Sequence, residues 1–326
     1  MKVLGNSGIE ISPIGLGTWA IGGDGVFGWG PQDDAASIAT IHHAVDSGIN
    51  WLDTAPIYGM GHSERVVARA LEELGSSRRP LVFTKCTLTW DDDKNVIHNP
   101  SEASIRREVE DSLRRLEVDV IDLYQIHWPV FPPGGDDSGI EEAWSTLADL
   151  KNQGKVRAIG VSNFDVGQLE RAQAIAPIAS LQPPYSALMR QIEDEILPYC
   201  LDHDIGTIVY SPMHNGMLTG TMTRERVDAL PESDWRKQVN PAFKEPLLTT
   251  CLEFVGVLRG IADRHSRSVG EVAIAWTLGH RAVTGAIVGA RNPSQVDGFI
   301  GAMDFRLRDD DMVEIGAALP ESMSLL

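Results

Sequence analysis

Four ionisable side chains fall where short apolar runs of this chain end: Asp53, Tyr58, Lys85 and His127. Asp53, Lys85 and His127 each close a run that is typical of a buried strand, and Tyr58 lies in the loop just after Asp53. Buried strands rarely carry such residues without partners, because burying an unpaired charge is costly. If the strands are parallel, all four side chains meet at one rim, where they could deliver a proton to a carbonyl group.

Tyr58 is the proton donor that we expect in this set. The pKa of a free tyrosine is about 10, and donation near neutrality would require a fall of about three pH units, worth roughly 4 kcal/mol. An ammonium at ~4 Å supplies about that energy at an effective dielectric of ~20, and Lys85 is the candidate. Asp53 would keep Lys85 charged while partly offsetting its field at Tyr58. His127 could position the carbonyl oxygen or relay a proton, and a cofactor would have to place the hydride.

The elements that must position these residues alternate between a short apolar strand and an amphipathic helix. Strands are predicted at residues 14–19, 49–53, 81–85, 120–127, 156–161, 178–182, 207–210 and 282–288. Helices are predicted at 33–48, 63–75, 101–116, 140–154, 166–174, 192–201, 247–265 and 269–278, with further ones from 293 and from 307. A long polar stretch covers residues 219–246.

This alternation predicts parallel strands. Eight such units can close into a (β/α)₈ TIM barrel, an α/β fold with its chemistry at the carboxyl ends of the strands. We therefore expect one domain over residues 1–326, with a short N-terminal strand segment and extra C-terminal helices. The rival architecture is an open doubly wound sheet.

Three glycines, Gly23, Gly25 and Gly28, match the G-x-G-x-x-G pattern of dinucleotide-binding loops. That pattern works only when a helix begins inside it, so that its amide groups meet the pyrophosphate. Here the predicted helix begins only after Asp33. We interpret the segment as an active-site loop, and a Rossmann-type dehydrogenase would require a helix starting at 25–28.

Composition limits which partners and which cellular location we expect for the protein. The 326 residues include 28 Lys+Arg and 46 Asp+Glu, a net charge of −18, which disfavours nucleic acids and anionic membranes as partners. Three cysteines without a C-x-x-C pair favour a reducing, cytoplasmic location. We expect no signal peptide, no membrane span and no metal site, because the sequence contains neither the long apolar runs nor the ligand clusters that these require.

Seven motifs run in order along nearly the whole chain. They are IGLGTW (14–19), LDTAxxYG (52–59), TK (84–85), DLYQIH (122–127), GVSNF (160–164), YSP (210–212) and GAR (289–291). Together they resemble the pattern of the aldo-keto reductases, and most closely the bacterial sugar- and inositol-type branch of that family. The resemblance implies the barrel fold, with Asp53, Tyr58, Lys85 and His127 as a catalytic tetrad.

The resemblance also implies a nicotinamide cofactor and the residues that bind it. Ser162, Asn163 and Gln182 would hold the carboxamide, whose donor and acceptor suit hydroxyl and amide side chains, and Tyr210 would stack on the ring. The other implied cofactor residues are Thr18, Trp19, Asp53, Ser211, Pro212, Met213, Asn215, Gly216, Met217, Gly289, Ala290, Arg291 and Gln295.

One departure from the family pattern bears on the choice of cofactor. An acidic or amide residue followed by Asn is usual a few positions after Gln295, but this chain has Gly298 and Phe299. Arg291 still offers a guanidinium suited to a 2′-phosphate. We therefore predict a preference for NADP(H), with NAD(H) possible.

The expected activity is reversible reduction of an aldehyde or ketone to an alcohol on a small sugar, oxo-sugar or polyol-like molecule. Trp19, Trp29, Trp90 and Trp128 would line the substrate pocket with Tyr58 and His127. We expect a monomer or a weak homo-oligomer. The alternative is a non-catalytic NADP(H)-binding, redox-sensing subunit, against which the intact tetrad argues.

Overall fold

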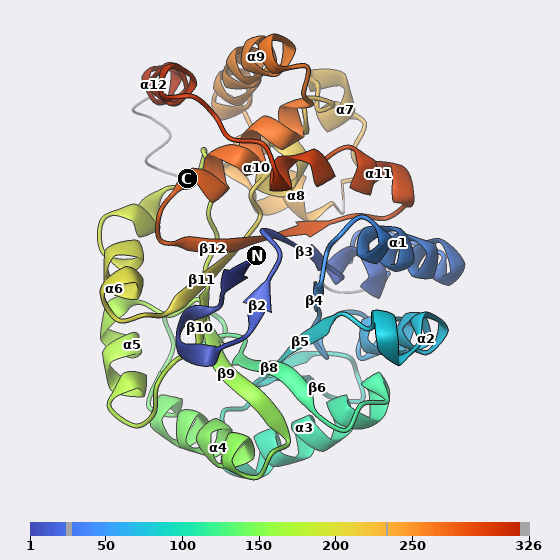
Figure 1. The fold of residues 1–326 in the computed structure, drawn as a ribbon, viewed down its shortest axis with the longest axis vertical. Helices are drawn as coiled ribbons and strands as arrows, with labels where there is room; N and C mark the ends of the chain where they lie inside the picture. The colour runs from blue at the N-terminus through green and yellow to red at the C-terminus, as the bar shows by residue number, and fades with distance from the viewer. Residues whose placement is uncertain (24–27, 233, 320–326) are drawn as a thin grey trace.

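The computed structural model describes residues 1–23, 28–232 and 234–319. Eight parallel strands close into a barrel in which each strand pairs with the next along the chain, and the last pairs back onto the first (Figure 1). These strands are β3 (Ile14–Gly17), β4 (Trp51–Asp53), β5 (Leu81–Cys86), β8 (Ile121–Ile126), β9 (Val156–Ser162), β10 (Ser180–Gln182), β11 (Gly206–Tyr210) and β12 (Val283–Gly289). The predicted single-domain TIM barrel is thereby confirmed over the open sheet.

A ring of helices surrounds the barrel, and Figure 1 shows them in chain order around its rim. They are α1 (Asp34–Asp46), α2 (His62–Leu74), α3 (Glu102–Leu116), α4 (Ile140–Asn152), α5 (Val166–Gln173), α6 (Ile196–Asp202) and α10 (Val269–Gly279). The side chains of Asp33, Ser101 and Asp165 each accept a backbone N–H at a helix start, which fixes where α1, α3 and α5 begin.

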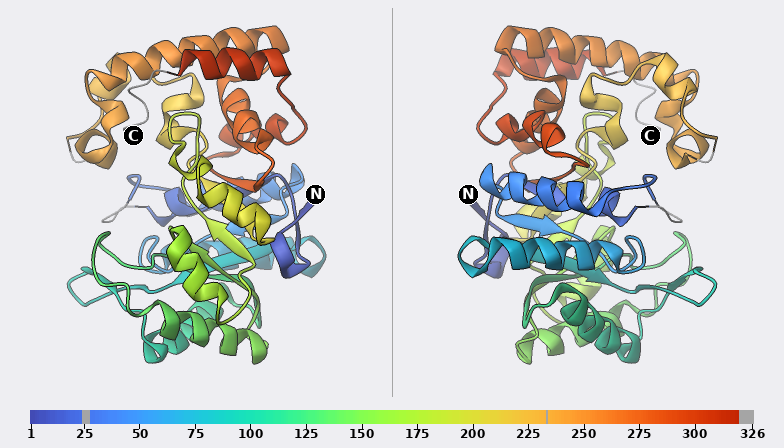
Figure 2. Two further views of the ribbon diagram at one scale, coloured as in Figure 1. Left: turned by 90° about the vertical axis from the view of Figure 1, so that its left-hand side faces the viewer. Right: turned by 90° about the vertical axis from the view of Figure 1, so that its right-hand side faces the viewer.

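Further helices lie outside this ring. They are α9 (Leu247–His265), α11 (Pro293–Asp297), α12 (Asp309–Ala318), and two short helices in the polar stretch, α7 (Arg224–Asp228) and α8 (Trp235–Val239). Figure 2 shows α12 lying along α9, where Asp311 is buried and accepts hydrogen bonds from Arg264 at 3.1 Å and His265 at 2.8 Å. The extra C-terminal helices are therefore confirmed, whereas α7 and α8 were not predicted, because five-residue helices give little periodicity.

The chain begins with an antiparallel hairpin of β1 (Lys2–Val3) and β2 (Glu10–Ile11). This hairpin is the predicted N-terminal strand segment. Its Ile9 and Ile11 pack in one cluster with Trp51 and Phe83, whose side chains come from the barrel strands. The Trp51 ring fills the barrel so closely that a Cβ on Gly15 would meet it at 2.3 Å. The hairpin therefore seals a packed interior and leaves the opposite rim for chemistry.

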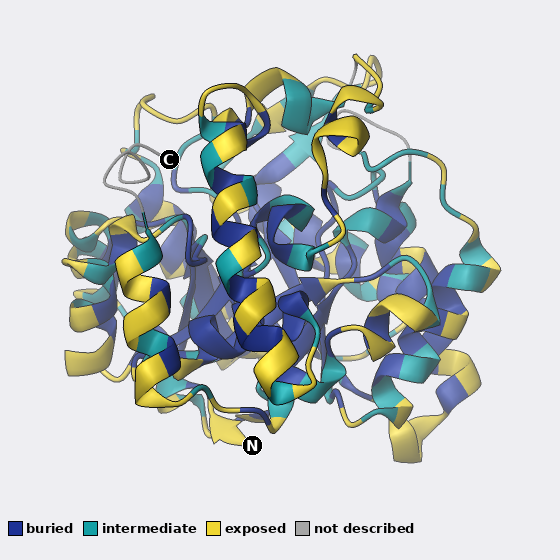
Figure 3. Cartoon of the chain, turned by 90° about the horizontal axis from the view of Figure 1, so that it is seen from above, coloured by how far each residue is buried: buried dark blue, intermediate teal, exposed yellow. Residues whose placement is uncertain are grey.

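A second hairpin, β6 (Leu88–Trp90) with β7 (Val96–His98), follows β5 and was not predicted. Single 3₁₀ turns complete the fold: η1 (Gly5–Ser7), η2 (Trp19–Gly22), η3 (Ser76–Arg78), η4 (Gln191–Glu193), η5 (His214–Thr219), η6 (Pro241–Phe243) and η7 (Ile300–Met303). Figure 3 shows buried residues along the barrel and on the inner faces of the helices, with exposed residues on the outer faces.

No helix begins at Gly28, the described end of the 25–28 range in which the Rossmann hypothesis requires one. Gly28 and Gly30 are not helical, and the next helix, α1, begins only at Asp34. Gly25 lies outside the described residues. Within the described ranges, we find no helix with the length and apolar character needed to cross a bilayer.

Candidate active site

The four predicted catalytic side chains come together at the carboxyl ends of neighbouring strands. Asp53 is the last residue of β4, Lys85 lies near the end of β5, His127 directly follows β8, and Tyr58 sits in the turn after β4. The Lys85 Nζ donates to Asp53 Oδ1 at 2.6 Å and lies 3.5 Å from the Tyr58 hydroxyl. The ammonium thus bridges the carboxylate and the phenol.

Two further contacts fix this arrangement. Lys85 Nζ also donates to the backbone carbonyl of Thr54 at 2.9 Å, which holds the ammonium against the turn that carries Tyr58. The His127 ring lies edge-on to Tyr58, with 5.9 Å between ring centroids. A carbonyl group placed between the phenol and the imidazole would be within reach of both.

The electrostatics at Tyr58 correct the expectation that Lys85 would pull the pKa of the phenol toward neutrality. Burial raises the pKa of Tyr58 well above its ordinary value, and the Asp53 carboxylate raises it further. Burial also lowers the pKa of Lys85, against the opposing effect of Asp53. Tyr58 is therefore a neutral phenol, the form that carries a proton to give, and the ammonium can act only by stabilising phenolate as it forms.

His127 is held in its neutral form. Burial lowers its pKa well below the ordinary value for histidine, and the neighbouring Lys85 ammonium lowers it further. A neutral imidazole can donate one hydrogen bond to a carbonyl oxygen without supplying the proton. Of the two predicted roles, the structure favours positioning the carbonyl over relaying a proton.

An amide network joins the tetrad to the predicted carboxamide site. Gln182 Nε2 donates to Asp53 Oδ2 at 2.8 Å, and Asn163 Nδ2 donates to the His127 backbone carbonyl at 3.0 Å. The Tyr210 hydroxyl donates to Asn163 Oδ1 at 2.8 Å, and Ser162 Oγ donates to the Gln182 carbonyl at 2.7 Å. The predicted hydroxyl, amide and ring groups therefore form one cluster beside the catalytic residues.

The segment after β11 is a tight turn that contains several residues with positive φ angles. Ser211, Asn215 and Gly216 all have positive φ angles, and the Ser211 hydroxyl donates to Asn215 Oδ1 at 3.0 Å. Backbone hydrogen bonds hold part of this turn, because the N–H groups of His214 and Gly216 donate to the carbonyls of Ser211 and Met213 at 2.8 and 3.1 Å. Pro212 and Met213 belong to the same turn, but the Met217 side chain is fully buried in the core, so only its backbone could serve a ligand.

Arg291 makes hydrogen bonds that were not predicted from the sequence. Its guanidinium donates to Gln32 Oε1 at 2.8 Å, to the Trp29 carbonyl at 3.2 Å and to the Pro31 carbonyl. Its backbone N–H donates to Gln295 Oε1 at 2.8 Å, next to Gly289 and Ala290 at the end of β12. The predicted adenosine-end residues therefore lie together, tied to the loop that precedes α1.

Gly298 and Phe299, which depart from the family pattern, differ in their surroundings. The Phe299 side chain is buried in the main core, and the Gly298 carbonyl accepts the Ser268 hydroxyl at 2.7 Å. Neither position is available to bind a ligand through a polar side chain. Arg291 and Gln295 both offer polar side chains at this end of the site.

Aromatic side chains cover the tetrad. Trp19 stacks beside Tyr58, with 6.3 Å between ring centroids, and contacts Trp29 at 5.4 Å and Trp235 at 5.5 Å. Trp235 was not predicted among the pocket residues, because it lies in the polar stretch. The signal available in the sequence was a single tryptophan between Asp234 and Arg236.

Thr18 is buried, and its hydroxyl donates to the Asp53 carbonyl at 3.1 Å, so it supports the end of β4.

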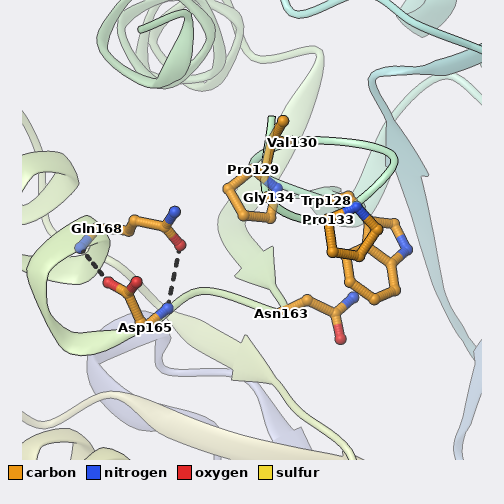
Figure 4. A pocket seen from close by; sticks show the side chains of 8 residues that line it. All are labelled: Trp128, Pro129, Val130, Pro133, Gly134, Asn163, Asp165 and Gln168. Atoms are coloured by element: carbon orange, nitrogen blue, oxygen red, sulfur yellow. Dashed lines mark hydrogen bonds between the residues drawn. The ribbon is translucent and has the colours of Figure 1, made fainter. Parts of the chain in front are cut away.

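Trp90 and Trp128 lie on another side of the tetrad. Both pack in a small apolar cluster that includes Tyr58. Trp128 also lines a pocket of about 180 Å³, together with Pro129, Asn163 and residues from the loop after β8 (Figure 4). Because Asn163 also bonds the His127 backbone, this pocket borders the site.

The sequence and the fold of this chain match those of a known family. A model of the aldo/keto reductase family matches residues 13–320. The chain is 39% identical to "Aldo-keto reductase YhdN" of Bacillus subtilis, covering 98% of this chain and 94% of that protein. It is 36% identical to an "NADH-specific methylglyoxal reductase" of Escherichia coli, covering 97% and 98%. The structure superposes on the glycerol dehydrogenase AKR11B4 of Gluconobacter oxydans with a TM-score of 0.87, 40% identity, and coverage of 98% and 94%.

Proposed function

On the premise that the chain belongs to the aldo-keto reductase family, we propose that it reduces the carbonyl group of a small, hydroxylated sugar or polyol-like compound, and oxidises the alcohol in reverse. It is an NAD(P)-dependent oxidoreductase. The observation that carries the proposal is the Lys85 ammonium, 2.6 Å from the Asp53 carboxylate and 3.5 Å from the Tyr58 hydroxyl.

In this proposal the protein's own residues orient the carbonyl and supply the proton. The neutral His127 imidazole donates a hydrogen bond to the carbonyl oxygen and so orients it. The Tyr58 phenol gives its proton to that oxygen, which is becoming an alkoxide and thus a stronger base than phenolate. The Lys85 ammonium stabilises the phenolate, and Asp53 holds the ammonium in place. Positioned acid catalysis of this kind contributes about 10²–10⁴-fold.

The bound nicotinamide cofactor would supply the hydride. The donor set fits it: Ser162, Asn163 and Gln182 offer hydroxyl and amide groups, and Tyr210 presents an aromatic ring fixed by its bond to Asn163. The positive-φ turn at 211–216 suits a pyrophosphate. Arg291 suits a 2′-phosphate, so we propose NADP(H) as the preferred form.

The substrate class is supported by the aromatic walls and by the names of the relatives. Trp19, Trp29, Trp90 and Trp128 would stack on the apolar faces of a small carbon skeleton. The named relatives include a glycerol dehydrogenase and a methylglyoxal reductase, and both names refer to small oxygen-rich compounds. The pocket beside Trp128 would accommodate the part of a longer substrate beyond its carbonyl.

A panel of aldoses, oxo-sugars, inositols and aromatic aldehydes tests the proposal, with NADPH and NADH oxidation or formation followed by absorbance. We expect the highest kcat/KM with short hydroxylated aldehydes and ketones. A strong preference for long apolar aldehydes would refute the substrate class. No turnover with any carbonyl, despite tight NADPH binding, would instead support the redox-sensing subunit.

We propose a cytoplasmic location. Cys86, Cys200 and Cys251 are all free thiols and all buried, as is usual in a reducing compartment. Fractionation of the native host cells, with the protein detected by antibody, tests this. Recovery in the secreted fraction would contradict it.

A further inference from the structure

Two buried indole N–H groups, each on a ring that contacts Trp19, meet no hydrogen-bond acceptor in the described part of the chain. Trp29 Nε1 and Trp235 Nε1 are inaccessible to solvent, and neither meets a hydrogen-bond acceptor among the described residues. Their rings contact each other at 5.7 Å and both contact Trp19, which stacks on Tyr58. The two donors therefore lie in the aromatic wall of the proposed substrate site.

In two other buried tryptophans of this chain, the indole N–H donates a hydrogen bond to a backbone carbonyl. Trp51 Nε1 donates to the Ser12 carbonyl at 2.9 Å, and Trp144 Nε1 donates to the Ala176 carbonyl at 3.1 Å. A buried tryptophan N–H usually finds such a partner, because leaving it unpaired forfeits its hydrogen bond to water. If the wall served only to exclude water, phenylalanine would do so without that cost.

The surroundings of the two donors favour an uncharged ligand. Two cations lie near these donors. Arg291 donates to the Trp29 backbone carbonyl at 3.2 Å and belongs to the proposed cofactor site. Arg236 stacks 4.8 Å from the Trp29 ring, and its guanidinium donates to both carboxylate oxygens of Asp234 at 3.0 and 2.6 Å, so the charge of Arg236 is already compensated. Neutral N–H donors with a compensated cation suit hydroxyl and carbonyl oxygens better than a phosphate.

We propose that Trp29 and Trp235 form a hydroxyl-reading subsite, in which the two indole N–H groups donate hydrogen bonds to oxygens of a neutral polyhydroxylated substrate whose reacting carbonyl lies at Tyr58. The inference rests on the proposed function and narrows its substrate class to unphosphorylated compounds. It also assigns a role to α8, the short helix within the polar stretch that begins at Trp235, whose ring contacts Trp19.

Indole NMR tests the subsite without turnover. The chain has eight tryptophans, so protein labelled with ¹⁵N at the indole should give eight N–H signals, of which Trp29→Phe and Trp235→Phe each remove one and thereby assign it. Glycerol is titrated with NADPH present, so that the alcohol is not oxidised, and propan-1-ol serves as the ligand with a single hydroxyl. We expect glycerol to shift both signals downfield and propan-1-ol to shift them much less. Equal responses to the two alcohols, or none, would overturn the proposal.

The discrimination between two aldehyde substrates gives a second test of the subsite. Glyceraldehyde and propanal share a three-carbon skeleton and differ in hydroxyl groups. Each of Trp29→Phe and Trp235→Phe should lower the ratio of kcat/KM for glyceraldehyde to that for propanal by about five-fold, the worth of one neutral hydrogen bond. The matched control is Trp276→Phe, a buried tryptophan that packs on Tyr185 away from the site, and it should leave the ratio unchanged.

The two possible failures are distinct. If the wild type reduces both aldehydes but the ratio survives in both variants, the N–H groups serve only the neighbouring rings and the inference is wrong. If the wild type reduces neither, the proposed function fails, and the NMR titration still decides whether the subsite binds hydroxyl groups.

Discussion

Lys85→Met separates the structural role of the buried ion pair from its chemical role. The Lys85 side chain is fully buried, and that of Asp53 is 4% exposed, with 2.6 Å between Nζ and Oδ1. At an effective dielectric of about 20, two charges at that distance attract by roughly 6 kcal/mol, part of which offsets their desolvation. Removing the lysine strands the carboxylate, so we expect the free energy of unfolding to fall by about 3–5 kcal/mol.

The matched variant carries both Asp53→Asn and Lys85→Met. It leaves neither charge in the core, and the asparagine carbonyl can still accept the hydrogen bond that Gln182 now gives to Asp53 at 2.8 Å. We therefore expect the double variant to regain most of the stability that Lys85→Met loses. Its kcat/KM should nevertheless stay at least about 100-fold below the wild type, because the phenolate of Tyr58 would have no ammonium to stabilise it.

Urea unfolding gives the stabilities of wild type, single and double variants, and initial rates with glyceraldehyde and NADPH give kcat/KM. The measurements are made on the same preparations. If activity returns together with stability in the double variant, the pair only holds the barrel together and the reasoning about Tyr58 is wrong. Equal urea midpoints for wild type and Lys85→Met would refute the calculated cost of the stranded carboxylate.

Three more expectations follow from single residues. Burial raises the pKa of Glu108 to about 7. The folded protein therefore holds the proton of this carboxyl group more tightly than the unfolded chain does. The free energy of unfolding should fall by roughly 3 kcal/mol as the pH rises from about 4.5 to about 7. Glu108→Gln should remove that fall, which unfolding at pH 5 and pH 8 measures; the same pH dependence in the variant would contradict it. Arg291→Ala should weaken NADPH binding by about 10- to 100-fold and NADH binding much less, by fluorescence titration; unchanged NADPH affinity would exclude its contact with a 2′-phosphate. Because the pKa of His127 is lowered well below its ordinary value, the pH profile of kcat/KM should show no inflection near pH ~6.5. An inflection there that disappears in His127→Gln would contradict this, because it would show that the imidazole titrates at that pH.

The barrel and the tetrad could be predicted because both depend on local signals. Each strand is a short apolar run, and each helix carries periodic apolar residues between a capping residue and a stop, so their order alone implies parallel strands. Once the strands are parallel, Asp53, Lys85 and His127 must share a rim, since each lies at or next to the carboxyl end of its own strand. The 2.6 Å contact between Lys85 Nζ and Asp53 Oδ1 is consistent with that topology.

What the sequence could not indicate are contacts between segments far apart in the chain. Gln32 and Arg291 are 259 positions apart, and nothing in either neighbourhood predicts their 2.8 Å hydrogen bond. Trp235 reaches Trp19 from a polar stretch in which a five-residue helix leaves no periodic pattern. The direction of the Tyr58 pKa shift could not be predicted for a related reason: it depends on the tertiary packing, in which burial, and then the Asp53 carboxylate, raise that pKa.

Tyr58→Phe tests the central claim most directly, because it removes only the hydroxyl that lies 3.5 Å from Lys85 Nζ. Turnover of glyceraldehyde and binding of NADPH are measured on the same sample, by absorbance and by fluorescence titration. We predict that kcat falls by at least about 100-fold while the affinity for NADPH stays within about two-fold of the wild type. A variant that still turns over at the wild-type rate would show that another group supplies the proton.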